Sequence, residues 1–556
     1  MKKSVRLAIS AAVALTVAVL VFYVTLPAIN VQNTGFWMFF AFIAAVFGGV
    51  YALCGVRSGV YRMVKGGKKG SQKITFEKGV STGKIIVAVV AVPLAVLLIG
   101  TLMSSTFFNA SRYSQIIEVK EAVFEEDMPE TDLVSNIALM DSASANIIGN
   151  RTLGALSEVV SQYQINGTYF QINYRRTPKK VSTLEYEDFF KWANNREKGI
   201  PGYVMVDPVN SSAEYIEFET PIRYTESAYF SEDLQRTLRF SYPTKIFGSC
   251  SFEIDEEGKP YYIVSCMKPR VGLFGAMDVN EVIIFNPCDG SSSLYALADV
   301  PAWVDNVFTG DLASEKFDWY GTLKNGFWNS VIGNKDCKVT TDDFGYIIIE
   351  DDVWFFTGVT SVSNDESNIG FIISNARTGE YKFYPVIGAE EYSAMKAAEG
   401  EVQEKGYVAS FPSLINVSGN ATYIMVLKDS GGLVKLYALV NVENYSIVAT
   451  GSTQTEAKEA YLKLLQQEGI LKPEDTPEPP APDNLLSAEI TVSNIRLVTV
   501  SGESWVYLTA EDGTLYKRSV AADESVLLIG VGDKITVKYT ATDVEKICSV
   551  VSWERT

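Results

Sequence analysis

The chain of 556 residues contains no histidine. This absence excludes nucleophilic sites that use a histidine base, HExxH zinc sites and most metal sites built on imidazole. Any catalysis would depend on carboxylates, lysine, tyrosine, serine or cysteine. The sequence also has no complete P-loop and no EF-hand calcium loop. We therefore assign no catalytic residue and expect neither a cofactor nor a bound metal.

Cysteine is scarce, with six residues and no CxxC pair. Cys54 lies in an apolar segment, and the other five lie beyond it, at positions 250, 266, 288, 337 and 548. Cys250 and Cys266 are almost symmetric about the dipeptide Glu257-Gly258. They either form a disulfide across a hairpin or remain two buried thiols, because a shift of one residue turns strand side chains to opposite faces.

Basic residues are in the minority, with 48 Lys and Arg against 66 Asp and Glu. The distribution is uneven, because residues 1–103 contain eleven basic residues and a single acid, Glu77. The chain beyond Met103 therefore has 37 basic and 65 acidic residues, a net charge of −28. An acidic body of this kind repels phosphate backbones. We expect no nucleic-acid partner.

Three segments lack charge entirely, namely residues 7–26, 36–54 and 85–103. Each is long enough to cross a hydrocarbon core of about 30 Å, which requires about 20 apolar residues. The loop 56–84 contains eight Lys or Arg, and the positive-inside rule assigns such a loop to the cytoplasm. The sequence thus predicts three transmembrane helices in the plasma membrane, a cytoplasmic N-terminus and an extracytoplasmic body.

The first apolar segment has an alternative interpretation as a cleaved signal peptide, because Lys2, Lys3 and Arg6 precede it. Its apolar run exceeds the usual length of about 7–15 residues, and no small-x-small cleavage motif follows. We expect the segment to be retained. None of the three segments contains an ionisable residue, which argues against a solute or ion path. Their expected role is to anchor residues 1–103 in a lipid bilayer.

The chain beyond residue 103 divides by pattern into four parts. Residues 104–243 mix helical and strand patterns and predict an α+β domain. Residues 244–470 repeat a hairpin pattern and predict an antiparallel, β-rich domain. Residues 471–485 include five prolines among acids and predict an extended linker. Residues 486–556 contain five short strand patterns and predict a small, OB-like β-barrel.

Three helices are expected in this region, at residues 153–163, 184–195 and 453–469. In the third, Thr453 and Glu456 have the spacing of a capping box, and Gly469 follows the last apolar position.

Within residues 244–470, pairs of apolar strands are separated by turns that contain glycine. The turns are Glu257-Gly258, Asp289-Gly290, Thr378-Gly379 and Asp429-Ser430-Gly431. Glycine adopts the positive φ that short hairpin loops require. The unit at 252–264, followed by the strand and turn at 282–290, resembles the PepSY-type sheet module of extracytoplasmic bacterial proteins.

Two further blocks extend the resemblance to most of the chain. Asp318-Trp-Tyr-Gly321 with its continuation to 329, and Asp352-Val-Trp354 with its continuation to 368, are similar to an uncharacterised group of multi-pass membrane proteins from Gram-positive bacteria. This resemblance implies no particular activity.

Aromatic and acidic residues are concentrated between positions 303 and 354. Four tryptophans, Trp303, Trp319, Trp328 and Trp354, accompany eight aspartates that include Asp351 and Asp352. Such residues bind glycans or cationic peptides, or supply paired carboxylates for glycoside hydrolysis. The alternative is that the aromatics fill the core of the sheets. A second feature is the basic tract of Arg175, Arg176, Lys179 and Lys180, which is either a solvated loop or a site for an anionic partner.

Three functional hypotheses remain open. The first is a membrane-anchored binding or scaffold protein of the bacterial cell envelope, with a protein, peptide or cell-wall partner. The second is a carboxylate-dependent enzyme that acts on glycan or peptidoglycan. The third is a subunit of a larger membrane complex. The absence of histidine favours the first hypothesis over the second.

Overall fold

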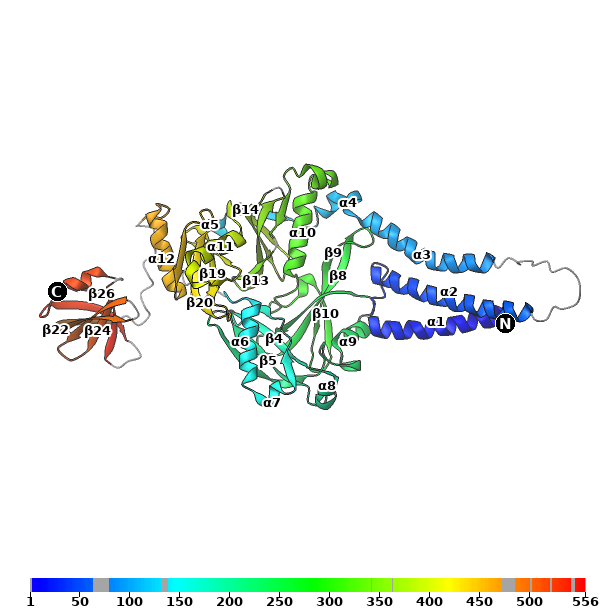
Figure 1. The fold of residues 1–556 in the computed structure, drawn as a ribbon, viewed down its shortest axis with the longest axis horizontal. Helices are drawn as coiled ribbons and strands as arrows, with labels where there is room; N and C mark the ends of the chain where they lie inside the picture. The colour runs from blue at the N-terminus through cyan, green and yellow to red at the C-terminus, as the bar shows by residue number, and fades with distance from the viewer. Residues whose placement is uncertain are drawn as a thin grey trace, which may run out of the picture. The chain divides into compact units, whose positions relative to one another are not determined.

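The computed structural model describes residues 3–63, 80–131, 139–341, 343–362, 364–472, 486–500, 503–520, 523–541 and 546–555. The chain forms two compact units, Met1–Leu471 and Lys472–Thr556 (Figure 1).

The first unit begins with three long helices, α1 (Lys3–Thr25), α2 (Thr34–Met63) and α3 (Val80–Ser104). Two segments, Ser4–Thr25 and Thr34–Cys54, are long and apolar enough to cross a membrane. A third span is present if Val89–Ser104 and α4 (Thr106–Tyr113), which are bent by 48° relative to each other, count as one. Residues 64–79 of the basic loop lie outside the described residues.

Two attachments join these helices to the body. At the end of α3, the Ser104 hydroxyl oxygen accepts hydrogen bonds from the backbone N–H groups of Leu273 (2.8 Å) and Phe274 (3.0 Å). In the connection between α1 and α2, the backbone N–H of Ile29 donates to the carbonyl of Pro243 (2.7 Å). The helices and the body therefore form one packed unit (Figure 1).

The body begins with β1 (Val119–Glu121) and α5 (Phe124–Asp127), followed by a first sheet in which α6 (Ser142–Gly154) packs on β5 and β6. The strands have the order β2-β4-β5-β6, and β3 also pairs with β4. They are β2 (Tyr163–Ile165), β3 (Phe170–Tyr174), β4 (Thr177–Tyr186), β5 (Ile200–Asp207) and β6 (Ser212–Ile222). The short helices of this region are α7 (Ser157–Val160), α8 (Phe189–Asn195), η2 (Phe230–Glu232) and α9 (Leu234–Ser241).

The helices expected at 153–163 and 184–195 are only partly correct. Helix α6 ends at Gly154, and Tyr163 already belongs to β2. Residues 184–186 extend β4, and α8 begins only at Phe189, because the Asp188 side chain accepts the backbone N–H of Lys191 (2.9 Å) and caps the helix there.

A four-stranded antiparallel sheet follows, in the order β10-β9-β8-β7. Its strands are β7 (Ile246–Ile254), β8 (Pro260–Val271), β9 (Gly275–Phe285) and β10 (Ser292–Ala296). One hydrophobic core combines this sheet with the first sheet and contains buried residues from Met140 to Phe285. The sequence pattern places a domain boundary between residues 243 and 244. In the structure, residues on both sides of this boundary share one hydrophobic core.

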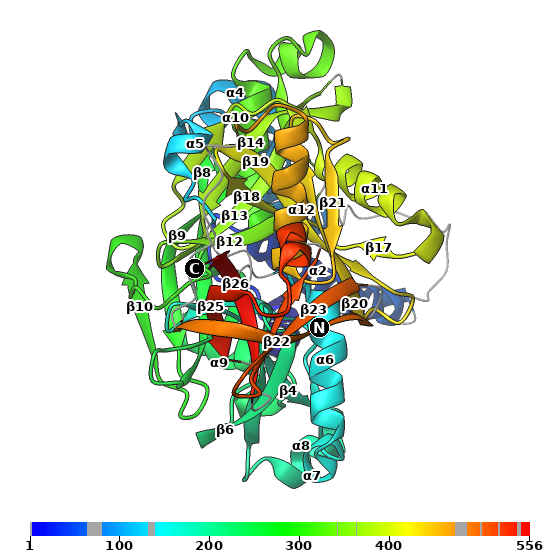
Figure 2. The same ribbon diagram turned by 90° about the vertical axis from the view of Figure 1, so that its left-hand side faces the viewer.

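The next part of the body has four layers: α10 (Gly310–Leu323), a seven-stranded sheet, a five-stranded sheet and α12 (Gln454–Gln467) (Figures 1 and 2). The seven-stranded sheet contains β1, β11 (Lys338–Thr340), β12 (Gly345–Ile349), β13 (Asp352–Ser361), β14 (Asn364–Asn375), β15 (Tyr381–Tyr384) and β16 (Gly388–Ala389). The five-stranded sheet contains β17 (Val408–Ala409), β18 (Ser413–Val417), β19 (Asn420–Lys428), β20 (Val434–Asn441) and β21 (Val448–Gly451). Helix α11 (Glu391–Glu401) contributes Ala394 and Ala398 to the core between the sheets.

The repeated hairpin turns share one pattern of hydrogen bonds between a side chain and the backbone. Each turn begins with an Asp or Asn whose side-chain oxygen accepts backbone N–H groups of the turn, and ends near a glycine with positive φ. The acceptor residues are Asp255, Asn286, Asn375 and Asp429. All four expected hairpins are present in the sheets. The N-cap at Thr453 is also confirmed, because the Thr453 hydroxyl accepts the backbone N–H of Glu456 (3.1 Å). The Glu456 carboxylate accepts the backbone N–H of Ser452 (2.9 Å), one residue before the N-cap position of an ideal capping box.

The second unit is a closed five-stranded barrel with its own hydrophobic core. The strand order is β22-β23-β24-β26-β25, and β24 and β26 are parallel. The strands are β22 (Leu486–Val500), β23 (Glu503–Ala510), β24 (Leu515–Ser519), β25 (Lys534–Ala541) and β26 (Ile547–Arg555). The prediction of a small five-stranded barrel is confirmed.

Candidate functional site

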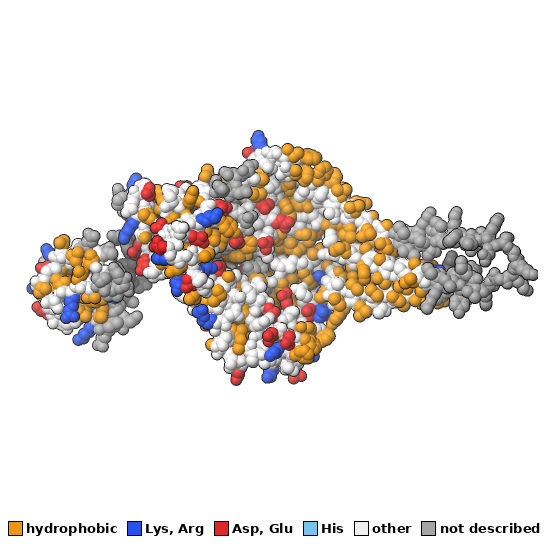
Figure 3. Space-filling model, in the orientation of Figure 1, with side chains coloured by type: hydrophobic (Ala, Val, Ile, Leu, Met, Phe, Trp, Pro, Cys, Tyr) orange, Lys and Arg blue, Asp and Glu red, His pale blue; other side chains and the backbone are white. Residues whose placement is uncertain are grey.

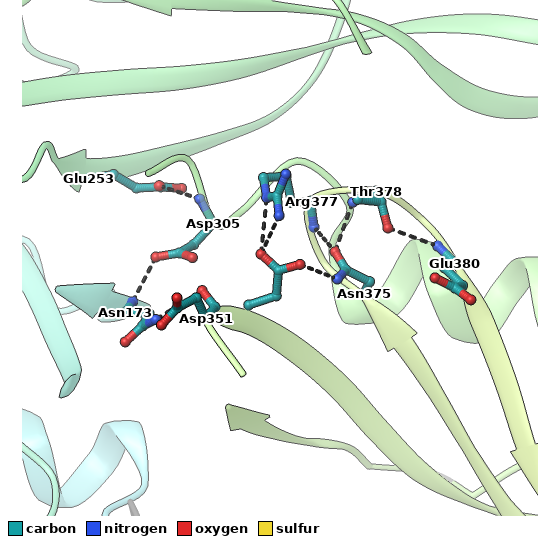
Figure 4. A network of polar contacts seen from close by, with 9 residues as sticks. Asn173, Glu253, Asp305, Asp351, Asn375, Arg377, Thr378 and Glu380 are labelled. Atoms are coloured by element: carbon teal, nitrogen blue, oxygen red, sulfur yellow. Dashed lines mark hydrogen bonds and ion pairs between the residues drawn. The ribbon is translucent and has the colours of Figure 1, made fainter. Parts of the chain in front are cut away.

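A buried polar network joins three sheets of the body around Asp305 (Figure 4). Glu253 on β7 is fully buried, and its carboxylate accepts the backbone N–H groups of Asp305 (2.8 Å) and Asn306 (2.9 Å). The Asp305 carboxylate in turn accepts the backbone N–H of Asn173 on β3 (2.6 Å). These bonds fix the loop before α10 between β7 and β3.

The surroundings of this network raise the pKa of both carboxyl groups. Burial raises the pKa of Glu253, and burial together with the nearby Glu253 charge raises the pKa of Asp305 well above its ordinary value. Both groups are bonded to backbone amides and closed off from solvent. This arrangement holds a loop in place, and it does not present an acid and a base to a substrate.

Asp352 belongs to the same network and stabilises a turn. Its carboxylate forms an ion pair with the Arg377 guanidinium, which lies in the β14–β15 turn. The Asn375 side-chain amide donates to its other oxygen (2.7 Å). Figure 4 shows this cluster beside Asp305. The sequence-predicted site residue Asp352 is therefore engaged within the protein.

An open hollow of about 620 Å³ lies beside the network. It brings together two sequence-predicted residues, Trp303 and Asp351, with Arg175 and Arg176 of the basic tract. Trp303 packs against Tyr261, with the ring centres 5.0 Å apart. The Arg176 guanidinium lies 3.6 Å from the Asp351 carboxylate, and both side chains are mostly exposed. This ion pair is exposed and weak, so both groups remain available to a ligand.

The turn that presents the two arginines is strained. Tyr174 pairs with Thr177, which leaves Arg175 and Arg176 as a two-residue hairpin loop. Their φ angles are 51° and 61°. Such a turn normally contains Asn-Gly, and a left-handed conformation costs other residues about 1–2 kcal/mol each. Strain of this kind is concentrated at functional sites.

The same hairpin borders two further cavities of about 530 and 370 Å³, which share Gln171. Gln171 lies directly opposite Lys180 in the β3–β4 ladder. Both side chains line the smaller cavity with Tyr169, and all three are more than nine-tenths buried. Among the described residues, the Gln171 amide nitrogen and the Tyr169 hydroxyl have no hydrogen-bond partner. Burial lowers the pKa of Lys180 to about 8.

The hairpin thus points hydrogen-bond donors and cations into adjoining hollows of an otherwise acidic body. Unpaired buried donors are costly to leave without a partner, and charged acceptors pair with them most strongly. Within the described parts of the chain, no three of the residue types Cys, Asp and Glu lie close enough together to hold a metal ion. The lining also contains acids, Glu256 and Asp351 in the open hollow and Asp141 and Asp343 in the smaller cavity. An anionic ligand such as a carboxylate would therefore have to pair directly with the guanidinium, ammonium and amide donors.

The four sequence-predicted tryptophans do not form one cluster. Trp319 packs against Tyr113 with the ring centres 5.0 Å apart. Trp328 is 64% exposed and contacts Phe107. Trp354 is buried in the core between the seven-stranded and five-stranded sheets. Only Trp303 lies in the hollow with Asp351.

The two cysteines considered for a disulfide are free thiols. A bulge lies between Phe247 and Cys250, so the ladder pairs Cys250 with Val264 and Cys266 with Phe247. Cys250 and Cys266 are therefore not cross-strand neighbours. Burial raises the pKa of the Cys266 thiol to about 12, which makes it a poor nucleophile.

Comparisons with known proteins give no match, either to a protein-family model or to a curated protein sequence.

Proposed function

We propose that the chain is a membrane-anchored binding or scaffold protein of a bacterial cell envelope. Helices α1, α2 and α3 would cross the plasma membrane, with the N-terminus and the basic loop in the cytoplasm and the body outside. The body would bind anionic groups of a protein, peptide or cell-wall partner at the β3–β4 hairpin. The resemblances to PepSY-type modules and to the Gram-positive group belong to this proposal.

One observation carries the binding assignment. Arg175, Arg176, Lys180 and Gln171 all project from one hairpin into hollows, although acidic residues outnumber basic ones in the chain. Guanidinium and ammonium groups that face a hollow pair most strongly with anionic groups of a partner. The strained Arg175-Arg176 turn supports this assignment, because the Asn-Gly sequence that adopts these φ angles with little strain would carry no guanidinium group.

The two attachments between helices and body support the scaffold role. Ser104 binds the β8–β9 turn, and Ile29 binds the end of the α9 region. A body fixed at two points has a defined position above a membrane. The parallel pairing of β24 with β26 in the barrel supports the expectation of an OB-like fold.

Binding is tested with the full chain in nanodiscs and a fluorescently labelled hexaglutamate peptide. Arg175→Asn/Arg176→Gly removes both guanidinium groups but keeps a favourable turn. We expect binding to weaken about tenfold, equivalent to about 1.4 kcal/mol. The control Lys198→Gln/Lys405→Gln removes the same net charge at exposed positions elsewhere and should bind like the wild type. Equal loss in both variants, or no binding by the wild type, would refute the assignment.

Topology is tested by labelling with an impermeant thiol reagent in intact cells. Ser291→Cys, at an exposed position of the body, should be labelled above the background of the native cysteines. Ser71→Cys, in the basic loop, should be labelled only after the membrane is permeabilised. Labelling of Ser71→Cys in intact cells would contradict the proposed orientation. Hydrolysis of peptidoglycan by the purified chain would favour the enzyme hypothesis instead.

A further inference from the structure

Large apolar side chains are exposed on the end of the body that adjoins the long helices. One group consists of Phe107 and Phe108 on α4 with Trp328 and Ile332 of the segment around η4 (Asn329–Gly333). A second group consists of Phe190 on α8 and Phe230 in η2. Ile332 and Phe190 are 74% and 73% exposed. We refer to these six residues as the apolar rim.

The rim is continuous with the helices that are apolar enough to span a membrane. Helix α4 follows α3 after a single residue, Ser105, and Phe107 contacts Trp328 with the ring centres 5.9 Å apart. Near the second group, Phe240 of α9 contacts Phe22 of α1 at 5.9 Å. Figure 3 shows the apolar surface of the helices continuing onto the neighbouring end of the body.

The sequence around the first group of the rim has the composition of a membrane interface, whereas acids lie close to Phe190 and Phe230 in the sequence of the second group. Residues 325–334 contain no charged side chain, but Lys324 and Lys335 flank them directly. Residues 105–111 are also uncharged and precede Arg112. Aromatic residues at the headgroup level, with long cationic side chains beside them, are typical of proteins at the surface of a bilayer. Large apolar side chains that are exposed together to water promote aggregation.

We infer that the apolar rim is immersed in the lipid leaflet on the body's side of the membrane, so that the body lies directly against the lipid surface. This inference rests on the proposed membrane insertion of α1, α2 and α3. It gives Trp328 a role as a membrane contact. It also fixes the distance between the membrane and the β3–β4 hairpin, because the rim belongs to the same packed unit.

The test measures tryptophan fluorescence of the full chain in nanodiscs that contain brominated lipids. The contribution of Trp328 is the difference between the wild type and Trp328→Phe. Phe190→Trp reports on the second group, and Leu98→Trp reports on an exposed position of α3. Val408→Trp, on β17 and 57% exposed, is the control for a surface position away from the rim.

We expect bromine in the upper part of the acyl chains to reduce the signals of Trp328 and of the Phe190→Trp variant roughly twofold, as for aromatic side chains at an interface. Bromine at the chain ends should have less effect on them. The added signal of Val408→Trp should be unchanged. If both rim signals behave like that control while the Leu98→Trp signal is quenched, the rim inference is wrong but membrane insertion stands. If the Leu98→Trp signal also escapes quenching, the proposed membrane insertion itself fails.

Discussion

Lys180 and Gln171 face each other across the β3–β4 ladder, and both side chains are buried beside a cavity of about 370 Å³. The neighbouring Lys179 lies on the opposite face of the strand, where its ammonium group binds the Asp207 carboxylate at 2.8 Å. Two consecutive lysines therefore have opposite roles. Lys179 stabilises the fold through an ion pair, whereas the burial of Lys180 costs stability that the nearby Asp141 charge offsets only in part.

We predict that Lys180→Met stabilises the protein. Burial lowers the Lys180 pKa to about 8 from 10.5, so between these values the unfolded chain binds more protons and stability rises with pH. Below about pH 8 the full cost of the buried charge is present, up to about 3 kcal/mol for a shift of this size. Thermal unfolding at pH 7 should therefore show a gain for Lys180→Met that diminishes towards pH 10.

The matched variant Lys179→Met should act in the opposite direction. Although burial raises it, hydrogen bonds from Lys179 and Asn210 lower the Asp207 pKa to about 2. The stability that this pair contributes is present above about pH 4 and is lost as the pH falls towards 2. We expect Lys179→Met to lower stability at pH 7 by about 1 kcal/mol. A loss of stability in Lys180→Met at pH 7 would show that Lys180 is satisfied within the protein.

Turns and helix caps could be predicted from the sequence more reliably than the face of a sheet on which a strand residue lies. The hairpin turns at Asp255 and Asn375 and the N-cap at Thr453 depend on neighbouring residues, and all were predictable. The sequence also showed the basic tract. It did not show that Arg175 and Arg176 form a turn while Lys179 and Lys180 lie on opposite faces of β4, because this depends on the residue at which the strand begins. Strand alternation separates Lys179 from Lys180 once that start is known.

Long-range placement was the part that the sequence did not contain. Trp303 and Trp354 are 51 positions apart and lie in different hydrophobic clusters, because α10 and a change of sheet intervene. Asp351 and Asp352 are adjacent, yet Asp351 borders the hollow and Asp352 binds Arg377. Gln171 gave no signal as a site residue, because only its pairing with Lys180 and its burial distinguish it from other glutamines.

We predict that Arg175→Asn/Arg176→Gly raises stability while it weakens binding. The present turn holds two arginines at positive φ, and relief of that strain should gain about 1–3 kcal/mol. Arg175→Lys/Arg176→Lys keeps both the charge and the backbone strain and removes the guanidinium contacts of Arg175 with the Glu256 carbonyl, so any fall of its thermal midpoint measures those contacts. If the Asn-Gly turn proves less stable than the wild type, the contacts of Arg175 with the Glu256 carbonyl (3.0 Å) outweigh the strain.

Ser104 is predicted to control the attachment of the body to α3. Its side chain is buried, and Ser104→Ala leaves the N–H groups of Leu273 and Phe274 without their acceptor. Two lost bonds to a buried group should cost about 1–3 kcal/mol. Hydrogen exchange at these two amides should accelerate, whereas Ser105→Ala, whose hydroxyl donates only to the nearby Leu102 carbonyl, should leave it unchanged. Equal exchange in the two variants would mean that other contacts hold the turn.

The barrel is predicted to survive separation from the rest of the chain. It is a compact unit, Lys472–Thr556, and its closed sheet leaves no strand edge that needs a partner. Residues 473–485 lie outside the described residues, but their five prolines predict an extended segment that a protease can reach. Limited proteolysis should release a fragment of about 70 residues that keeps the circular dichroism of β structure.

Val537 provides the control for this experiment, because it is fully buried in the barrel core. A carboxylate at that depth would be unpaired, so Val537→Asp should unfold the barrel. Digestion should then destroy the fragment and leave the first unit intact, because the two units have separate hydrophobic cores. Resistance of the wild-type linker to cleavage, or loss of the first unit together with the barrel, would show that the two units depend on each other for folding.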